Sequence, residues 1–503
     1  MRLKLSTLLL VASLALTSSL IVNAQAPASQ AVATRPAART VVTLAHFNDV
    51  YEIGAMDGGK SGGLARVATL VSSLKRTTSA LLVTMGGDYL SPSAIGTARV
   101  NGEPLAGRQM VDVLNAAGLQ WATLGNHEFD VTEAAFKLRM AESKFGVVVS
   151  NVTDAQGKLF DHTVSTAVVP LKVNGRVIRI GLIGLVGDFT QKPWVKYQPT
   201  VEAGRIAIAA LKGKVDAIVA LTHLSLAQDA DVANALPEID LILGGHEHEN
   251  WMLRRGPHFT PIVKADANVR SLAIVSMEFG GKGTRPKVSA EWRLVDAQIK
   301  PAAAVEKLVE KWTTLGFEAF HKDGFDPTAA VALLTDPLDG RQTTVRNRPG
   351  LLTQIIANSM RREANAELGV FNGGSVRIDD VLLPGPVTEY DVIRVVPFGG
   401  KVVRATLEGS LLARVLDQGL QNIGNGGYLH ESDGTTHTPQ GWVINGAPLD
   451  VNRKYVVGIS DFLLTGGETN LGYLTRTNPG VTDITELRDV RRAVIDELKA
   501  RYK

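Results

Sequence analysis

Residues 121–130 read WATLGNHEFD, and this stretch decides the fold. The apolar run WATL stops at a glycine and is followed by residues that can bind a metal ion or carry a proton. Apolar runs of this length between turn residues predict buried strands. The stretch therefore predicts a strand whose end presents chemical groups, among them Asn126, His127 and Asp130.

Six other apolar runs in the first half of the chain end in the same way. The polar residues that follow them are, in chain order, Asn48-Asp49, Asp88, Asn151, Asp188, His223 and His246-Glu247-His248. Open α/β folds gather the ends of several strands at one rim of a sheet, where their sites lie. A rim that carries Asp, Asn and several His side chains is typical of a metal site.

Each position also has a simpler interpretation. An Asp or Asn after a strand is commonly a helix N-cap or a turn former, and a lone His is more often structural than a ligand. The combination is less easily explained, because Gly-Gly-Asp, Gly-Asn-His-Glu-Phe-Asp and Gly-His-Glu-His all stand at predicted strand ends. The adjacent glycines let the backbone approach an ion or a phosphate closely.

The pattern along the chain divides it into two folded regions. Strands alternate with helical patterns over 41–300, which predicts an α/β domain. An amphipathic pattern begins at Pro301 and predicts a helix over 301–324 that links the two domains. Residues 325–503 have shorter strands and denser glycines, which predicts a smaller α+β domain. The predicted helices besides the connector are 65–74, 107–117, 131–144, 203–211, 351–366 and 409–418.

The N-terminus and the composition indicate an exported protein. Residues 1–24 have the basic start, apolar middle and small-residue end of a signal peptide, and 25–40 form an Ala- and Pro-rich flexible leader. The chain has no cysteine, which excludes disulfides and thiolate ligands and suits a bacterial periplasm or secretion. No later apolar run is long enough for a stable membrane anchor. The formal charge of +3 falls to about +1 without the signal peptide, which carries Arg2 and Lys4 and no acidic residue, so nothing favours a nucleic-acid polymer as partner.

These motifs together resemble the signature of calcineurin-like metallophosphoesterases. With the second-domain motifs below, they resemble more narrowly the 5′-nucleotidase family, which includes periplasmic UDP-sugar hydrolases. The resemblance implies an N-terminal four-layer α-β-β-α sandwich and two divalent metal ions, zinc, manganese or similar. It implies that Asp88 bridges the ions, that Asn126, His223 and His246 complete one site, and that Asp49 and His248 belong to the other.

His127 and Asp130 are candidate catalytic residues. They stand three residues apart at the start of a predicted helix, so they can hydrogen-bond on one face. The resemblance implies that His127 stabilises charge on the phosphoryl oxygens or the leaving group, and that Asp130 orients it. The alternative is that His127 is only a structural neighbour of Asn126.

The first strand departs from the family pattern. The family reads Asp-x-His there, whereas this chain reads Asp49-Val50-Tyr51. A phenol is a poor ligand unless the metal draws off its proton. Three interpretations are open. Tyr51 binds the metal directly, a water molecule takes the ligand position of the missing His, or the first metal site is weak and the enzyme slow. We prefer the water molecule on sequence grounds.

The second domain contains three glycine-turn segments, 371–377, 396–400 and 461–468. Each alone is an ordinary turn, but together they resemble the nucleotide-specificity domain of the 5′-nucleotidases. The resemblance implies that Phe398 and Phe462 stack on the base, that Arg346 and Arg377 bind phosphate, and that Asn372 hydrogen-bonds the substrate. Glu468 stands where the family has an Asp that contacts ribose.

The expected function is hydrolysis of nucleoside 5′-monophosphates to nucleoside and phosphate, by attack of a metal-bound hydroxide. UDP-sugar diphosphatase and 2′,3′-cyclic phosphodiesterase activities are alternatives on the same machinery. A degenerate, non-catalytic nucleotide-binding protein is an alternative of another class, suggested by Tyr51. The sequence does not determine the metal, the preferred nucleotide or the oligomeric state.

Overall fold

The computed structural model describes residues 39–281 and 283–503. The predicted signal peptide over 1–24 and nearly all of the predicted leader over 25–40 lie outside the described residues. Among the described helices, none combines the length and the apolar character that a membrane span requires.

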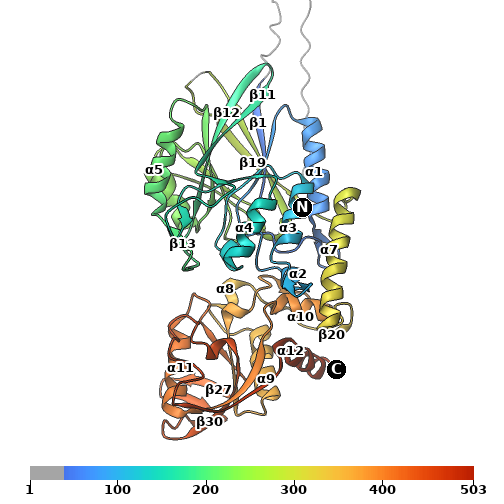
Figure 1. Ribbon diagram of the computed structural model, residues 1–503, viewed down its shortest axis with the longest axis vertical. Coiled ribbons are helices and arrows are strands. Elements are labelled where there is room, and N and C mark those ends of the chain that lie inside the picture. Colours follow the sequence, from blue (N-terminus) through green and yellow to red (C-terminus); the bar gives the residue numbers. More distant parts are fainter. Residues whose placement is uncertain (1–38, 282) are drawn as a thin grey trace, which may run out of the picture. The chain divides into compact units, whose positions relative to one another are not determined.

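Two large sheets form the first part of the fold (Figure 1). The seven-stranded sheet has the order β10 (Thr163–Val164), β8 (Gly146–Val148), β7 (Trp121–Ala122), β4 (Leu81–Met85), β1 (Thr40–Phe47), β18 (Ser271–Phe279) and β19 (Lys287–Leu294). The six-stranded sheet has the order β11 (Thr166–Val173), β12 (Arg176–Val186), β14 (Ala217–His223), β15 (Leu241–Gly244), β17 (Thr260–Lys264) and β16 (Trp251–Arg255).

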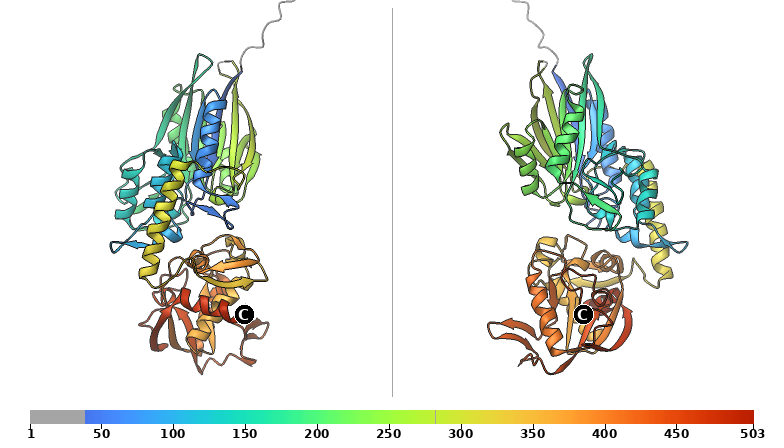
Figure 2. Two further views of the ribbon diagram at one scale, coloured as in Figure 1. Left: turned by 90° about the vertical axis from the view of Figure 1, so that its right-hand side faces the viewer. Right: turned by 60° about the vertical axis from the view of Figure 1, so that its left-hand side comes forward.

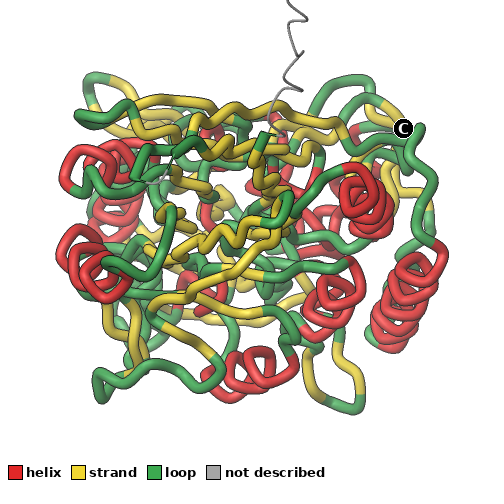
Figure 3. Tube along the Cα trace, turned by 90° about the horizontal axis from the view of Figure 1, so that it is seen from above, coloured by secondary structure: helices red, strands yellow, loops and turns green. Residues whose placement is uncertain are grey.

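The two sheets pack face to face, and helices cover both outer faces (Figure 3). Apolar side chains of both sheets, such as Leu44 and Leu243, fill the layer between them. The outer face of the seven-stranded sheet packs against α1 (Leu64–Thr77), α3 (Arg108–Ala117) and α4 (Glu133–Glu142). The outer face of the six-stranded sheet packs against α5 (Thr200–Leu211) and α6 (Leu226–Ala235). The predicted four-layer α-β-β-α sandwich is therefore confirmed.

Parallel pairing places the functional strand ends together. β1, β4 and β7 are parallel neighbours, and so are β12, β14 and β15. Within each sheet the carboxyl ends of these strands lie on one side, because the strands are parallel. The two sets of ends meet at one rim, where His223 after β14 lies 2.7 Å from the carbonyl oxygen of Gly86 after β4. The polar residues of the sequence motifs follow these ends.

A long helix, α7 (Ala303–Lys322), follows the sandwich and packs along α1 and α3 (Figure 2). The indole N–H of Trp312 donates a hydrogen bond of 2.9 Å to Asp112, which fixes this helix to α3. The observed helix confirms that a connector lies in this part of the chain. The boundaries 301–324 and 325–503 remain predictions.

The C-terminal part has a five-stranded mixed sheet with the order β26 (Leu429–Glu431), β22 (Leu368–Asn372), β30 (Lys454–Ser460), β25 (Lys401–Glu408) and β31 (Val481–Asp489). Helix α11 (Gly409–Gln421) packs on one face, and α9 (Leu351–Glu363) with α12 (Val490–Arg501) packs on the other. This arrangement confirms the predicted α+β class.

One helix prediction is wrong in detail. The helix predicted over 131–144 forms as α4 (Glu133–Glu142), but His127 and Asp130 do not stand at its start, because His127 lies in a separate 3₁₀ turn over His127–Phe129 and Asp130 follows that turn. The reason is Thr132, whose side chain accepts a hydrogen bond from the Ala135 N–H and caps α4 at its own N-terminus.

Candidate metal centre and substrate site

The predicted metal ligands converge on the rim. Asp49, Asp88 and His223 each offer a donor atom, and these three atoms lie within 4.8 Å of one another. All three side chains are fully buried. Asn126, His246 and His248 follow β7 and β15 at the same rim. Residues that follow strands of two different sheets, and that lie more than 190 positions apart in the sequence, therefore come together at this rim.

The backbone at four of the predicted ligands is left-handed. The φ angles are 52° at Asp49, 57° at Asp88, 83° at His246 and 61° at His248. Such a conformation costs about 1–3 kcal/mol at a non-glycine residue and persists only where surrounding contacts impose it. The neighbouring Gly125 is equally constrained, because a Cβ there would lie 2.1 Å from Asp88 Oδ1. Four of the predicted ligands are thus held in a strained backbone conformation.

We call Asp88, Asn126, His223 and His246 the amide–imidazole half of the centre. His223 Nδ1 lies 2.7 Å from the carbonyl oxygen of Gly86. A carbonyl only accepts, so Nδ1 carries a proton, and Nε2 is the ring nitrogen that faces the cluster. His223 Nε2 lies 3.1 Å from Asp88 Oδ2.

Two buried atoms of the amide–imidazole half make no hydrogen bond to any described residue. They are Asn126 Oδ1 and His223 Nε2, both donor types that divalent ions accept. Burial opposes protonation of His223, yet Asp88 and Asp49 outweigh it and raise the pKa of the imidazole to about 9. The surroundings thus favour positive charge at this point. The residues present fit a divalent ion.

His246 is held on both sides. Its ring stacks on Phe189 with a centroid distance of 4.1 Å and an interplanar angle of 2°. Its backbone N–H donates a hydrogen bond of 2.9 Å to Asp49 Oδ2. Burial and the neighbouring His223 lower the pKa of His246 to about 3. The ring is therefore neutral and able to act as a ligand.

We call Asp49, Tyr51 and His248, with the shared Asp88, the tyrosine half of the centre. The hydroxyl of Tyr51 lies 2.9 Å from His248 Nε2 and 3.3 Å from both Asp49 Oδ1 and Asp88 Oδ2. Tyr51 is only 4% exposed. On its far side, His248 Nδ1 forms an ion pair with Asp379, which belongs to the C-terminal part of the chain.

A buried lysine connects the two histidine-bearing strand ends, and the sequence motifs did not reveal it. Lys264 Nζ donates to the carbonyl oxygen of Leu224, next to His223, at 2.6 Å and to that of Gly245, next to His246, at 2.8 Å. Asp229 neutralises the ammonium at 2.9 Å, and both side chains are fully buried. Lys264 therefore positions both histidines of the amide–imidazole half.

Glu128 is a second positioning residue to which the sequence gave no role. Its carboxylate accepts the backbone N–H groups of Asp88 at 2.9 Å, Tyr89 at 2.6 Å and Leu90 at 3.0 Å, and also that of Gly125. It thereby joins the loop after β4 to the loop after β7. The signal was available in the sequence, since Glu128 lies within the motif at 125–130.

The predicted catalytic pair forms as expected. His127 Nδ1 lies 2.7 Å from Asp130 Oδ2, and the backbone N–H of His127 donates to Asp88 Oδ1 at 2.8 Å. Arg377 donates to the same Asp130 oxygen at 3.0 Å. Burial opposes ionisation of Asp130, but His127 and Arg377 outweigh it and lower its pKa to about 2. Asp130 is therefore an anion that orients the imidazole.

A cavity of about 400 Å³ joins the metal centre to the C-terminal part. Its lining includes His246, His248, Arg346 and Asp379. Burial and the nearby Arg377 lower the pKa of Arg346 to about 10, and Arg346 Nε has no hydrogen-bond partner among the described residues. A cationic guanidinium with an unused N–H thus lies beside the candidate ligands.

The remaining predicted substrate residues form two groups. Asn372 Nδ2 donates a hydrogen bond of 2.6 Å to Glu468 Oε2, so these two act as one unit. Phe398 and Phe462 are 55% and 42% exposed, which is unusual for such large apolar rings. The Arg377 guanidinium carbon lies 5.4 Å from the centroid of the Phe398 ring.

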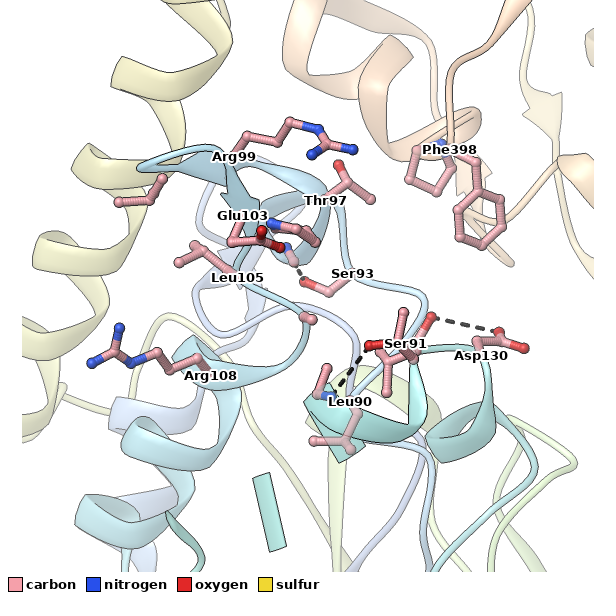
Figure 4. Close-up of a pocket in the computed structure, with 18 of the residues that line it drawn as sticks. Leu90, Ser91, Ser93, Thr97, Arg99, Glu103, Leu105, Arg108, Asp130 and Phe398 are labelled. Atoms are coloured by element: carbon pink, nitrogen blue, oxygen red, sulfur yellow. Dashed lines mark hydrogen bonds between the residues drawn. The ribbon is translucent and has the colours of Figure 1, made fainter. Parts of the chain in front are cut away.

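Phe398 also borders a larger cavity, of about 830 Å³, beside the catalytic pair (Figure 4). Asp130 and Ser91 line it from the sandwich, and Arg99 and Glu103 stand on a hairpin at its far side. Ser91 Oγ donates to Asp130 at 3.5 Å, which is a weak contact. Of the two candidate catalytic residues, Asp130 therefore borders this cavity.

Comparison with known families agrees with this geometry. Residues 42–250 match the calcineurin-like phosphoesterase family, and residues 329–474 match the 5′-nucleotidase C-terminal domain. The first range contains every predicted metal ligand, and the second contains every predicted substrate residue.

Individual relatives match over most of the chain. A 5′-nucleotidase from Bos taurus is 24% identical over 505 residues, covering 86% of this chain and 84% of the relative. The protein UshA of Yersinia enterocolitica is 25% identical over 493 residues, covering 85% and 86%. The crystal structure of a 5′-nucleotidase precursor from Thermus thermophilus has the same fold, with a TM-score of 0.72 and 22% identity, and covers 92% of this chain and 97% of its own. The chain belongs to the 5′-nucleotidase family of calcineurin-like phosphoesterases and is a phosphoric monoester hydrolase.

Proposed function

We propose that this protein is an exported, metal-dependent nucleotidase that hydrolyses nucleoside 5′-monophosphates to nucleoside and phosphate. The observation that carries the proposal is the cavity shared by His246, His248 and Arg346. It brings candidate ligands and a candidate phosphate-binding cation to one space. A phosphoryl group fits there, because both a metal ion and a guanidinium stabilise its negative charge.

Two divalent ions, zinc, manganese or similar, would be held by the two halves of the centre and would supply a clamp on the phosphoryl oxygens and a water molecule of lowered pKa. Arg346 and Arg377 neutralise the remaining phosphoryl charge and fix its orientation. Asp130 holds the proton at His127 Nδ1, so the Nε2 edge faces Asp88 at 4.0 Å. A proton at Nε2 stabilises the oxygen that leaves with the nucleoside.

The exposed aromatic rings support a nucleotide rather than a simple phosphate ester as substrate. Phe398 and Phe462 can stack on a base, which contributes roughly 1–3 kcal/mol per base. Asn372 and Glu468 form a hydrogen-bonding pair that can meet the hydroxyls of a sugar. The additional methylene of Glu468 relative to the family's Asp shifts this carboxylate outward, which affects which sugar is preferred.

The sequence over 1–24 supports export to a bacterial periplasm or medium, and the absence of cysteine is compatible with it. The proposed function also assigns the domains. Residues 41–300 form the catalytic domain, residues 301–324 form the linking helix, and residues 325–503 form the domain that recognises the substrate.

Rates across nucleotides, cyclic nucleotides and nucleotide sugars test the proposal. The protein is stripped with a chelator and refilled with one metal at a time, and released phosphate is measured. We expect AMP and related monophosphates to be hydrolysed fastest, and the stripped protein to be inactive. UDP-glucose turnover far above AMP turnover would assign the protein as a UDP-sugar diphosphatase instead. Nucleotide binding without turnover under every metal would make it a binding protein.

Phe398→Ala provides a sharper test of base stacking. We expect it to raise KM for AMP and to leave KM for p-nitrophenyl phosphate nearly unchanged. The exposed Phe259, which lies outside the site at 69% exposure, gives a matched control in Phe259→Ala. Equal effects of Phe398→Ala on both substrates would argue against stacking.

A further inference from the structure

We propose that Tyr51 is itself a metal ligand and binds through its phenolic oxygen, so that the tyrosine half holds its ion with oxygen-rich donors. The inference rests on the proposed metal dependence, and it replaces the water molecule that the sequence alone favoured. It concerns the one position at which this chain departs from the Asp-x-His pattern of the metal motif.

The distances around the hydroxyl fit a ligand. Metal–oxygen and metal–nitrogen bonds of about 2.0–2.2 Å place neighbouring donor atoms roughly 3.0–3.4 Å apart. The Tyr51 hydroxyl lies 2.9–3.3 Å from donor atoms of Asp49, Asp88 and His248. Asp49 Oδ1 and His248 Nε2 are also 3.3 Å apart. The phenolic oxygen therefore occupies a corner of a coordination shell.

The count of protons leads to the same conclusion. Two carboxylate oxygens of Asp49 and Asp88 face the phenol and can only accept. His248 Nδ1 faces the carboxylate of Asp379, and its Nε2 edge faces Tyr51. At least two acceptors thus meet a group that has a single proton to donate. A cation among the four donor atoms satisfies all of them.

The ring is also fixed in this orientation. The backbone N–H of Tyr51 donates to Asn268 Oδ1 at 2.9 Å. The ring packs edge-on against His127, with centroids 6.3 Å apart, and tilted against His248 at 5.4 Å. All three hydrogen-bond contacts recorded for the hydroxyl go to predicted metal ligands. The side chain is preorganised for this role.

The two halves then differ in the ions they prefer. The tyrosine half offers two carboxylate oxygens, a phenolic oxygen and one imidazole. The amide–imidazole half offers two imidazoles, an amide oxygen and the shared carboxylate. Oxygen donors suit harder ions such as manganese or ferric iron, whereas imidazole suits zinc. We expect the tyrosine half to take the harder ion of a mixed pair.

Metal binding by stripped protein, measured by calorimetry with manganese alone and checked by elemental analysis, tests the inference. We expect two equivalents for the wild type. Tyr51→Phe should weaken the tyrosine half by about tenfold or more, in line with the effect of losing metal-site contacts. Tyr51→His should restore the affinity. Tyr197→Phe, which removes a hydroxyl bonded to the Thr190 carbonyl, is the matched control and should change nothing.

Ferric iron provides a readout that is independent of activity. A phenolic oxygen bound to ferric iron gives a visible charge-transfer band. We expect the band in the wild type and in Tyr197→Phe, and not in Tyr51→Phe or Tyr51→His. Iron bound without the band, or a band that persists in Tyr51→Phe, would overturn the ligand assignment. Circular dichroism verifies that each variant is folded.

The two proposals fail in different ways. A wild type that binds two manganese ions and hydrolyses AMP, with Tyr51→Phe binding both ions equally well, contradicts only the role of Tyr51. A wild type that binds no metal at either half contradicts the proposed function itself.

Discussion

The two halves of the metal centre are built differently. Every contact described for the amide–imidazole half comes from the sandwich: Lys264 holds the backbone beside His223 and His246, and Glu128 holds the loop of Asp88. The tyrosine half depends on a phenol in place of an imidazole and on Asp379 from the C-terminal part. The first half is held by contacts within the sandwich, whereas the second takes a contact from the C-terminal part of the chain.

The difference shows where this enzyme can vary without losing its chemistry. A change in the amide–imidazole half disturbs a fully buried network. A change in the tyrosine half alters donors beside the cavity that His248 and Asp379 line. The substitutions below are ordered from the largest expected effect to the smallest.

His127→Ala removes an imidazole whose Nε2 lies 4.0 Å from Asp88, the predicted ligand that the two halves share. We expect kcat for AMP to fall by about 10²- to 10⁴-fold, the usual contribution of a positioned acid–base residue. Both halves should still bind metal, because His127 is not among the predicted ligands. Steady-state kinetics with elemental analysis measures both quantities. Loss of metal together with activity would instead make His127 a structural part of the centre.

Lys264→Met should break the amide–imidazole half. It leaves Asp229 and two carbonyl groups buried without their partner, and removal of one member of a buried ion pair costs about 3–5 kcal/mol. Urea denaturation measures the free energy of unfolding. The double variant Lys264→Met/Asp229→Asn should recover part of the loss, because no carboxylate is then left unpaired.

Lys137→Met is the control for that experiment. Lys137 is 57% exposed and pairs with Glu133 on a helix surface, so its removal should leave the free energy of unfolding nearly unchanged. A similar loss for Lys264→Met and Lys137→Met would show that the buried network contributes nothing special.

Asp379→Asn should weaken only the tyrosine half. Loss of a carboxylate that orients a metal-binding imidazole lowers metal affinity by about 10- to 100-fold. We expect chelation to empty one site of this variant before the other, as followed by stepwise removal of manganese. Asp336→Asn, at an exposed turn, is the matched control. Equal loss from both sites would indicate that the two halves do not bind independently.

Phe189→Leu should give the smallest effect. The ring of Phe189 stacks on His246, and aromatic pairs contribute about 0.5–1.5 kcal/mol beyond their buried area. We expect metal affinity of the amide–imidazole half to fall only a few-fold, measured by the same calorimetry. A loss as large as that of Asp379→Asn would mean that His246 is held mainly by stacking.

The sequence by itself determined the strand ends and most candidate ligands. Apolar runs that stop at glycine are local patterns, and Asp49, Asp88, Asn126 and His223 follow them directly. Parallel strands end on one side of a sheet, so their convergence could be predicted without coordinates. The pairing of His127 with Asp130 was also local, although the two residues lie in and after a separate 3₁₀ turn rather than at the start of a helix.

Only the tertiary structure decided what surrounds those ligands. Lys264 contacts a carbonyl 40 residues away, and Asp379 pairs with a histidine from another part of the chain. The direction of the Tyr51 hydroxyl likewise depends on residues nearly 200 positions distant. Such contacts have no local period or spacing. They follow from how sheets and domains pack, and packing is fixed by the whole chain at once.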